Sequence, residues 1–482
     1  MASVARAARR SFLHAGRRFT STDAGVASRQ RALPPPRLDY RGVSENIVYK
    51  STNAINRKAP IARDAIQAVA RAYTELKTIS GSLNAQRNAR SAVGERIRRS
   101  AVANDVKEKE LAMAEALKIK EEIARLEPAL AAVEESLLSL ALAIPNDTHP
   151  SSPLGPESAA VTLSTHGPEL LAADSRRDHV TIAKKFGLVD FEGAATVTGS
   201  SWYYLLNEAA LLEMALTNYA LHIAAKHGFS PVTTPDVVRS DIASRCGFQP
   251  RDDPDSPASQ VYHLQSKDLV LAATSEIPLA GMFASKLYLD TALPLKVVGI
   301  GRAFRAEAGA RGSDTRGLYR VHQFTKVELF AVTKAEESER MMEEMKAVQM
   351  SIMNGLRVPY RILDMPSEEL GASAYRKYDI EAWMPGRGAW GEVCSLSNCT
   401  DYQSRRLHIR YQVNPTTGTT PTKPTTFAHT LNGTAAAIPR LIITLLENGA
   451  TFDEQGELVS IALPEVLKPF WIETDRTIIT WR

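Results

Sequence analysis

The chain has 482 residues, of which 44% are hydrophobic and 23% are charged. This length allows two or three domains, and the composition is that of a globular protein, which excludes a disordered or fibrous chain. The formal net charge of +4 is compatible with a nucleic-acid partner but does not identify one.

Neither the apolar runs nor the cysteines suggest a membrane or a disulfide-linked protein. No uninterrupted apolar run approaches the roughly 18 residues of a membrane span. The three cysteines, Cys246, Cys394 and Cys399, form no CxxC pair, so we expect neither disulfides nor a structural zinc ion. We therefore expect a soluble protein of a reducing compartment, with no membrane partner.

The first 37 residues are rich in arginine and nearly free of acids. They hold eight arginines and a single acid, Asp23, among many alanines, serines and threonines. This composition is typical of a mitochondrial transit peptide, so we expect residues 1–37 to be removed before Leu38 and the protein to reside in the mitochondrial matrix. A disordered basic arm that touches RNA is the alternative.

Two helical stripes follow. Apolar residues recur at steps of three and four from Ile66 to Leu83 and again from Ile119 to Leu140. Such stripes predict two helices that pack lengthwise on each other as an antiparallel coiled-coil hairpin. We expect the polar stretch Gln86–Ser100 to form the turn, and Pro128 to kink or end the second helix.

The expected turn is strongly basic. One acid, Glu95, opposes five arginines, which are Arg87, Arg90, Arg96, Arg98 and Arg99. A basic tip suits contact with RNA, because each neutralised phosphate releases counterions; a solvated helix end would look similar. The Pro- and Ser-rich stretch after Pro145 predicts a linker. We therefore expect an arm over 38–145, a linker over 146–178 and a larger domain over 179–482.

The larger domain mixes helix and strand patterns. A helical face runs over 205–219, and strand-like runs cover 293–307, 319–332 and 391–398. In the second run His322, Phe324, Lys326, Glu328 and Phe330 share one face. They alternate with Val321, Gln323, Thr325, Val327 and Leu329, which predicts an antiparallel sheet with one chemically loaded face. A low-complexity Pro/Thr loop covers 414–427.

The stretch 304–328 carries the parts of an ATP site. It places four arginines, the two glutamates Glu307 and Glu328, and Phe324 on two strands and the Gly-rich loop between them. Guanidinium groups suit phosphates, an aromatic ring suits the base, and carboxylates suit a metal or an amine. The chain has neither a GxxxxGK[ST] loop nor a GxGxxG fingerprint. An antiparallel ATP-binding fold is favoured, with a salt-bridged surface hairpin as the alternative.

The chain resembles the bacterial and organellar seryl-tRNA synthetases, which are class II aminoacyl-tRNA synthetases, from about Leu38 to Phe470. HGFSPVTTP (227–235) is similar to class II motif 1, FRAEAGARGSDTRGLYRVHQFTKVE (304–328) to motif 2, and HTLNGTAAAIPRLIITLLEN (429–448) to motif 3. TSE (274–276) resembles the serine-binding loop, and GEVCSLSNCTDYQSRR (391–406) resembles the strand that binds metal and ATP. The resemblance implies an α+β fold with an antiparallel sheet core flanked by helices, a tRNA-binding N-terminal hairpin and a homodimer.

The resemblance also implies L-serine, ATP with Mg²⁺, and tRNA(Ser) as ligands. Arg305, Arg440 and Glu392 are the implied catalytic residues, and Glu392 and Ser395 the implied Mg²⁺ ligands. The implied ATP site comprises Arg305, Ala306, Glu307, Arg320, Val321, Phe324, Glu392, Val393, Cys394, Ser395 and Arg440. The implied serine pocket comprises Thr274, Ser275, Glu276, Arg305, Glu328, Asn432 and Thr434.

Two of these motifs depart from the family pattern. Residues 392–395 read EVCS where the family usually has EISS, and Thr434 stands where serine is common. Segment 249–260 also departs from it. The alternatives are a catalytically inactive synthetase-like mitochondrial protein that binds RNA or another partner, an aminoacyl transferase to a carrier protein, and another class II synthetase. The retained arginines and acids oppose the first, the hairpin opposes the second, and the short segment after motif 3 opposes the third.

Overall fold

The computed structural model describes residues 33–248, 261–265, 268–307, 316–413 and 424–482. Nearly all of the expected transit peptide lies outside these residues, as do the departing segment 249–260, residues 308–315 of the motif 2 stretch and most of the 414–427 loop. The chain divides into two units, residues 1–34 and 35–482. The second unit contains every element described below.

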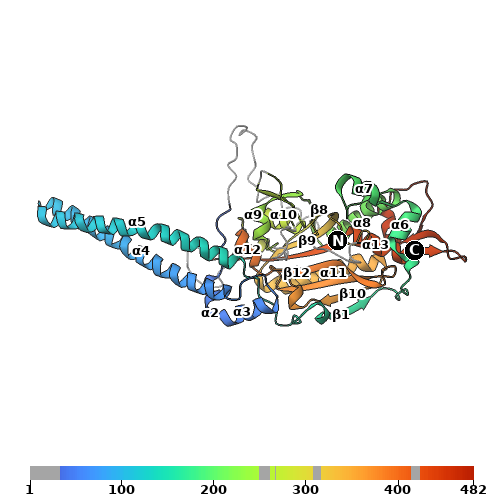
Figure 1. Cartoon of the computed structure of the whole chain (residues 1–482), viewed down its shortest axis with the longest axis horizontal. Coiled ribbons are helices and arrows are strands. Elements are labelled where there is room, and N and C mark those ends of the chain that lie inside the picture. Colours follow the sequence, from blue (N-terminus) through green and yellow to red (C-terminus); the bar gives the residue numbers. More distant parts are fainter. Residues whose placement is uncertain (1–32, 249–260, 266–267, 308–315, 414–423) are drawn as a thin grey trace, which may run out of the picture. The chain divides into compact units, whose positions relative to one another are not determined.

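The predicted helical hairpin is confirmed. After α2 (Tyr40–Glu45) and α3 (Ile47–Asn56), the long helices α4 (Ala65–Val102) and α5 (Val106–Leu142) run along each other (Figure 1). One buried cluster joins Ile66, Val69 and Leu137 near the base, and a second includes Leu83, Val93, Ile119 and Ile123. The two apolar stripes thus form one seam, as their three- and four-residue steps predict.

The expected position of the turn was wrong. The stretch 86–100 is helical, and the chain turns at residues 103–105. Alanine and arginine are good helix formers, and Val93 continues the buried seam through the basic stretch. The turn signal is instead Asn104, with a φ of 54°, followed by Asp105, whose side chain accepts from the Glu108 backbone N–H at 3.0 Å. The five arginines therefore lie along α4.

The expected end of the helix at Pro128 was also wrong, because α5 continues through this proline, while the expected kink at this position stays a prediction. An interior proline costs a helix about 3 kcal/mol or more in isolation. Here Leu126 is buried and Leu130 partly buried against α4 on either side of it. Tertiary packing of the hairpin therefore outweighs the local penalty.

An eight-stranded sheet forms the body of the described residues. Its strand order is β1 (Val161–His166), β10 (Tyr360–Asp364), β11 (Arg376–Met384), β12 (Ala389–Asn398), β15 (His429–Ala437), β9 (Gln323–Thr333), β8 (Leu295–Phe304) and β4 (Ser230–Thr233). Every pairing is antiparallel except β4 with β8. The three predicted strand runs are confirmed as β8, β9 and β12.

The segment expected as a linker contributes the edge strand β1, which pairs with β10. Its residues, VTLSTH, include Val161, Thr162 and Thr165, whose branched side chains favour an extended backbone. The neighbouring prolines and serines concealed this short strand in the sequence.

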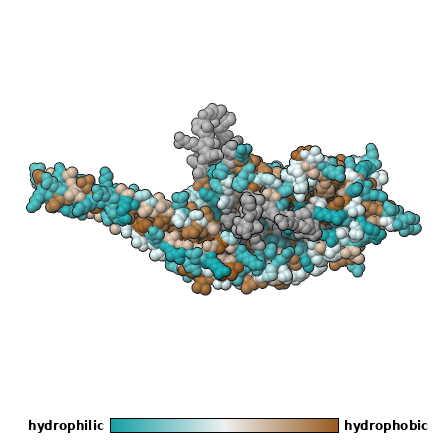
Figure 2. Space-filling view, viewed as in Figure 1, coloured by the Kyte–Doolittle hydropathy of each residue, from teal (hydrophilic) through white to brown (hydrophobic). Residues whose placement is uncertain are grey.

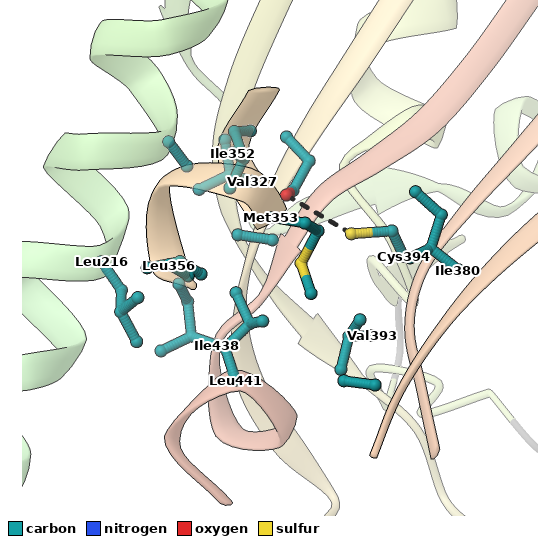
Figure 3. Close-up of a cluster of buried hydrophobic side chains, with 14 of the residues drawn as sticks. Leu216, Val327, Ile352, Met353, Leu356, Ile380, Val393, Cys394, Ile438 and Leu441 are labelled. Atoms are coloured by element: carbon teal, nitrogen blue, oxygen red, sulfur yellow. Dashed lines mark hydrogen bonds between the residues drawn. The ribbon is translucent and has the colours of Figure 1, made fainter. Parts of the chain in front are cut away.

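Helices cover one face of the sheet and bury its main core (Figure 1). These are α8 (Asn207–Lys226), which confirms the helix predicted over 205–219, α11 (Ser338–Leu356) and α13 (Ile438–Gly449). Figure 3 shows Leu216, Ile352, Met353, Leu356 and Leu441 from these helices gathered against Val327, Ile380 and Cys394 of the strands. The opposite face of the sheet carries the polar side chains described in the next subsection, and it lies beside α10 (Glu276–Met282) and α12 (Tyr402–Leu407).

Shorter elements complete the body. The remaining helices are α6 (His179–Phe186), α7 (Phe191–Thr198) and α9 (Ser240–Arg245). The remaining strands form small sheets: β2 (Val189–Asp190) with β3 (Tyr204–Leu205), β5 (Val237–Arg239) with β6 (Leu269–Leu271), β14 (Thr425–Phe427) with β13 (Arg410–Gln412) and β7 (Leu287–Leu289), and β16 (Ala450–Phe452) with β17 (Leu458–Leu463) and β18 (Ile479–Trp481).

The surface of the hairpin is mixed in character. Figure 2 shows hydrophilic and hydrophobic residues interspersed along it, and the apolar side chains of Leu111, Met113 and Leu117 on α5 are more than half exposed. None of the described helices has the length and apolarity needed to cross a membrane.

Candidate active site

A cavity opens on the sheet face away from α8, α11 and α13. Strand β9, the ends of β8 and β12, and the β15–α13 junction bring its walls together. The lining residues are Arg305, Glu307, Leu318, Tyr319, Arg320, Val321, Phe324, Lys326, Glu392, Ser395, Thr434, Ala437, Pro439 and Arg440. Most of the residues implied for ATP binding therefore share one cavity.

Two guanidinium groups stand over aromatic rings in this cavity. Arg305 lies 5.3 Å from the ring centre of Phe324, and Arg440 lies 4.7 Å from that of Tyr319. Arg440 also donates from Nε to the Tyr319 carbonyl at 3.2 Å and from Nη1 to the Glu392 carbonyl at 3.0 Å. Burial and then the charge of Arg440 lower the pKa of Arg305, but a guanidinium stays protonated. Two like charges held this close favour a bound anion.

An irregularity in β12 places Glu392 and Ser395 on the same face. Residues three apart in a regular strand point to opposite faces. Here the pairing with β11 passes from Cys394↔Ile380 directly to Glu392↔Glu381, so Val393 is an extra, bulged residue. A similar shift in β15 between Thr434 and Ala436 lets Thr434 and Ala437 both line the cavity.

Two side chains implied for the ATP site point away from it. Val393 and Cys394 are buried in the core on the helix-covered face (Figure 3), where the Cys394 Sγ lies 3.6 Å from the Ala435 carbonyl oxygen. Ala306 is also absent from the described lining of the cavity. The cysteine that departs from the family pattern is thus a core residue.

Adjacent substitutions on β12 test this alternation. We expect Cys394→Ser to leave the KM values for ATP and serine within about twofold of the wild type, because the Ala435 carbonyl can accept from the new hydroxyl. Ser395→Ala removes an oxygen from the cavity and should lower kcat/KM by about tenfold or more. Steady-state kinetics of both variants check this. A larger loss for Cys394→Ser would contradict the assigned faces.

The oxygens of Glu392 and Ser395 fit a magnesium ion. Burial raises the pKa of Glu392, but the charges of Lys377, Arg440 and Arg305 together outweigh it, so the pKa lies below its usual value. An ionised carboxylate and a hydroxyl are hard oxygen donors, which Mg²⁺ prefers together with water and phosphate oxygens.

A second group of polar side chains lies deeper on the same face. The carboxylate of Glu276 accepts from Gln403 Nε2 at 2.6 Å and from Asn432 Nδ2 at 3.0 Å. Lys326 lies 2.8 Å from Glu328 and donates to the Thr274 hydroxyl at 3.0 Å. The Glu276 backbone N–H donates to the Thr274 hydroxyl at 3.3 Å, so these contacts join Thr274, Glu276, Glu328 and Asn432, which were all implied for the serine pocket. Lys326 links this group to the cavity, because it also lines the cavity together with Thr434, whose hydroxyl lies 3.4 Å from that of Ser395.

The two carboxylates in this pocket resist full ionisation. Burial and then the charge of Glu328 raise the pKa of Glu276 to about 7. Burial also raises the pKa of Glu328, although Lys326 opposes the shift. A small cation between such groups would favour their ionised forms, so the pocket suits the ammonium group of an amino acid.

Some functional residues were missed or misplaced. Ser275 was implied for the serine pocket, but its hydroxyl lies 3.4 Å from that of Thr234, beside Gly301. Lys326 was assigned no role, although its spacing of two residues from both Phe324 and Glu328 placed it on the same, chemically loaded face of the strand. Gln403 gave no signal in the sequence, because its contact with Glu276 depends on how α12 packs.

Comparisons with known proteins agree with this geometry. The seryl-tRNA synthetase N-terminal domain family matches residues 38–148, and the class II tRNA synthetase core domain family (G, H, P, S and T) matches residues 261–449. The serine–tRNA ligase of Rhodopirellula baltica is 40% identical over 442 residues, which cover 91% of this chain and 99% of that protein. The mitochondrial serine–tRNA ligase of Saccharomyces cerevisiae is 40% identical over 458 residues, 92% of this chain and 97% of that protein.

A solved structure extends the likeness to three dimensions. The crystal structure of the Pyrococcus horikoshii seryl-tRNA synthetase complexed with ATP matches with a TM-score of 0.80 and 32% identity, over 90% of this chain and 98% of that one. The chain therefore belongs to the seryl-tRNA synthetase family of class II aminoacyl-tRNA synthetases.

Proposed function

We propose that this protein is a serine–tRNA ligase, which activates L-serine with ATP and transfers the seryl group to tRNA(Ser). One observation carries the proposal: a cavity with two partly buried arginines and Glu392 adjoins a pocket that holds Glu276 and Glu328. The arginines and Glu392 suit a nucleoside triphosphate, and the two glutamates of the pocket suit the ammonium group of a small amino acid.

In the first step, the serine carboxylate attacks the α-phosphorus of ATP and pyrophosphate leaves. Negative charge grows on the phosphate oxygens, so correct positioning and nearby cations can supply most of the catalysis. Arg305 would hold the α-phosphate and the serine carboxylate, while Arg320 and Arg440 would hold the outer phosphates. Phe324 would stack on the adenine ring, with Glu307 at its edge. Magnesium, when held by Glu392 and Ser395, supplies further positive charge to the phosphates.

No protein nucleophile takes part in this reaction. In the second step, the terminal ribose hydroxyl of the tRNA attacks the carbonyl carbon of seryl-adenylate, and AMP leaves. A pocket that hydrogen-bonds the serine hydroxyl should reject alanine by roughly 10⁴-fold, because its buried polar groups would be left unpaired. Threonine would be excluded by its extra methyl group.

The arm supplies the tRNA contact in this proposal. Arg90, Arg98 and Arg99 lie on α4. Arg98 and Arg99 are close to the turn, and both are more than two-thirds exposed. Exposed cations on a long helix suit a phosphate backbone. The arm would thereby select the tRNA while the cavity selects the amino acid.

We also propose a homodimer in the mitochondrial matrix. Strand β4 of motif 1 forms an edge of the described sheet, where a second copy can dock, and sedimentation analysis tests the dimer. Matrix location rests on the arginine-rich composition of residues 1–37 and on the mitochondrial relatives, although bacterial relatives are equally similar. Import of a reporter fused to residues 1–37 tests it.

ATP–pyrophosphate exchange tests the central proposal. We expect exchange that depends on serine, and serine charging of tRNA(Ser) by the same protein. Exchange driven by another amino acid would remove the serine assignment, and its absence with all amino acids would favour a non-catalytic protein.

The pKa of Glu276 predicts how serine binding depends on pH. This carboxyl must be ionised to attract the ammonium group, and its pKa is raised to about 7. We therefore expect the KM for serine to be constant above pH 7 and to rise by up to about tenfold per unit below it, with the KM for ATP much less affected. Glu276→Gln should raise the KM for serine at every pH and remove the dependence. A flat profile in the wild type would contradict this role.

A further inference from the structure

A buried pair of side chains outside the cavity holds the segment that leads into β9. His179 is the first residue of α6, and Glu447 lies in α13 with a fully buried side chain. The Nδ1 atom of His179 lies 3.0 Å from Glu447 Oε1, and the His179 backbone N–H donates to the same oxygen at 3.3 Å. The opposite ring nitrogen, Nε2, accepts from the Leu318 backbone N–H at 3.3 Å.

These partners define the state of the imidazole ring. Because Nε2 accepts a hydrogen bond from a backbone amide, Nδ1 must carry the ring proton and donate a hydrogen bond to Glu447. The contact also requires a glycine at position 317, where φ is 65° and a Cβ atom would lie 2.1 Å from His179 Nε2. His179 is thus an acceptor fitted closely to the backbone at Gly317 and Leu318.

The other carboxylate oxygen of Glu447 is connected to the cavity indirectly, through Arg387 and Tyr319. Glu447 Oε2 accepts from the backbone N–H groups of Gly386 at 2.8 Å and Arg387 at 3.1 Å. The guanidinium of Arg387 lies 3.8 Å from the ring centre of Tyr319. One buried carboxylate therefore acts on two consecutive residues, Leu318 and Tyr319, and both line the cavity.

A cation site does not explain this cluster. The ligand atoms of Asp178, His179 and Glu447 lie within 4.8 Å of one another. Asp178, however, accepts from Arg316 at 2.9 Å and from the Thr181 backbone N–H at 3.2 Å. His179 and Glu447 have the partners described above. Hydrogen bonds thus already engage all three side chains, and one of them ties Arg316 to the same segment.

We propose that His179, supported by Glu447, is a positioning residue for ATP. It touches no substrate. It fixes the backbone at Leu318, and through it the places of Tyr319 and Arg320 in the cavity. Arg440 depends on the same segment, because its Nε donates to the Tyr319 carbonyl. The inference rests on the proposed function, in which this cavity binds ATP, and it assigns no contact with serine.

Two substitutions separate the ends of the ring. The amide of His179→Asn lies where Nδ1 lies, so it can donate to Glu447 but leaves the buried Leu318 N–H without an acceptor. The amide of His179→Gln reaches the Nε2 position and can accept from Leu318. The full-length variants are compared by calorimetric titration with ATP, by the KM values for ATP and serine in exchange, and by thermal unfolding.

We expect His179→Asn to weaken ATP binding by roughly 3- to 10-fold, the effect of one unpaired buried donor, with the KM for serine and the melting temperature near wild type. His179→Gln should recover most of the affinity. The proposal is overturned if both variants bind ATP like the wild type, if glutamine restores nothing, or if ATP and serine are affected equally as the melting temperature falls. Calorimetry with ATP needs no serine, so a wild type that binds ATP without serine-dependent exchange would refute the proposed function alone.

Discussion

Replacing Arg305 by alanine should lower kcat/KM in serine-dependent exchange by about 10²- to 10³-fold, the usual cost of losing a fixed group that stabilises charge in a transition state. Arg305 follows directly after β8, and its backbone N–H donates to the His322 carbonyl at 2.8 Å. Its guanidinium stands over Phe324 and is proposed to hold the α-phosphate. Exchange kinetics over a range of ATP and serine concentrations measure the loss.

A matched control distinguishes this loss from a general loss of positive charge. Arg340 on α11 is exposed and pairs with Glu344 at 2.8 Å, so Arg340→Ala should remain within about twofold of the wild type. Arg305→Lys keeps the charge but not the fork of two donors, and should fall between alanine and wild type. An alanine variant that keeps most of its activity would show that the cavity is not the reaction centre.

Shortening the arm should abolish tRNA charging and spare amino-acid activation. Arg87 on α4 and Glu127 on α5 pair across the hairpin at 2.9 Å. Residues 88–126 can therefore be removed and the two helices joined by a short glycine-rich turn, which shortens both helices to the same level. The base cluster around Ile66, Val69 and Leu137 remains. We expect exchange within about twofold of wild type and charging lowered by about 10²-fold or more, because several phosphate contacts are lost together.

A milder variant tests the arginines themselves. Alanine at Arg90, Arg98 and Arg99 should weaken tRNA binding and reduce its dependence on salt, since each lost phosphate contact removes about one released counterion. Filter binding over a range of salt concentrations measures both effects. If the protein with the shortened arm, described above, still charged tRNA normally, the tRNA contact would have to lie outside the arm.

The fold was predictable where the pattern was long and periodic. The stripes of the hairpin, the helix at 205–219 and the alternation in β9 all follow from residue spacing, and the structure confirms each. The position of the turn and the helix end expected at Pro128 were wrong, because local signals were interpreted without the buried seam that includes Val93 and Leu126. Tertiary packing, which only the folded hairpin displays, decided both.

The sequence allowed the residues of the candidate site to be predicted, but not the face of the sheet to which each side chain points. Motif resemblance named Glu392 to Ser395 as a block, whereas the structure turns the inner two into the core. Sequence alternation assumes a regular strand and cannot foresee a bulge. The supporting groups, Gln403 and His179, come from elements distant in the chain, so no local pattern could identify them.

The bulge at Val393 has a consequence for which changes this chain tolerates. Substituting the bulged residue alters only a packing contact. Deleting it would restore a regular pleat, and every side chain of β12 on one side of the deletion would then point to the opposite face of the sheet. Ser395 would then enter the hydrocarbon interior and Cys394 would face the nucleotide. Over this stretch, variation in residue identity should be tolerated far more readily than any change in the number of residues.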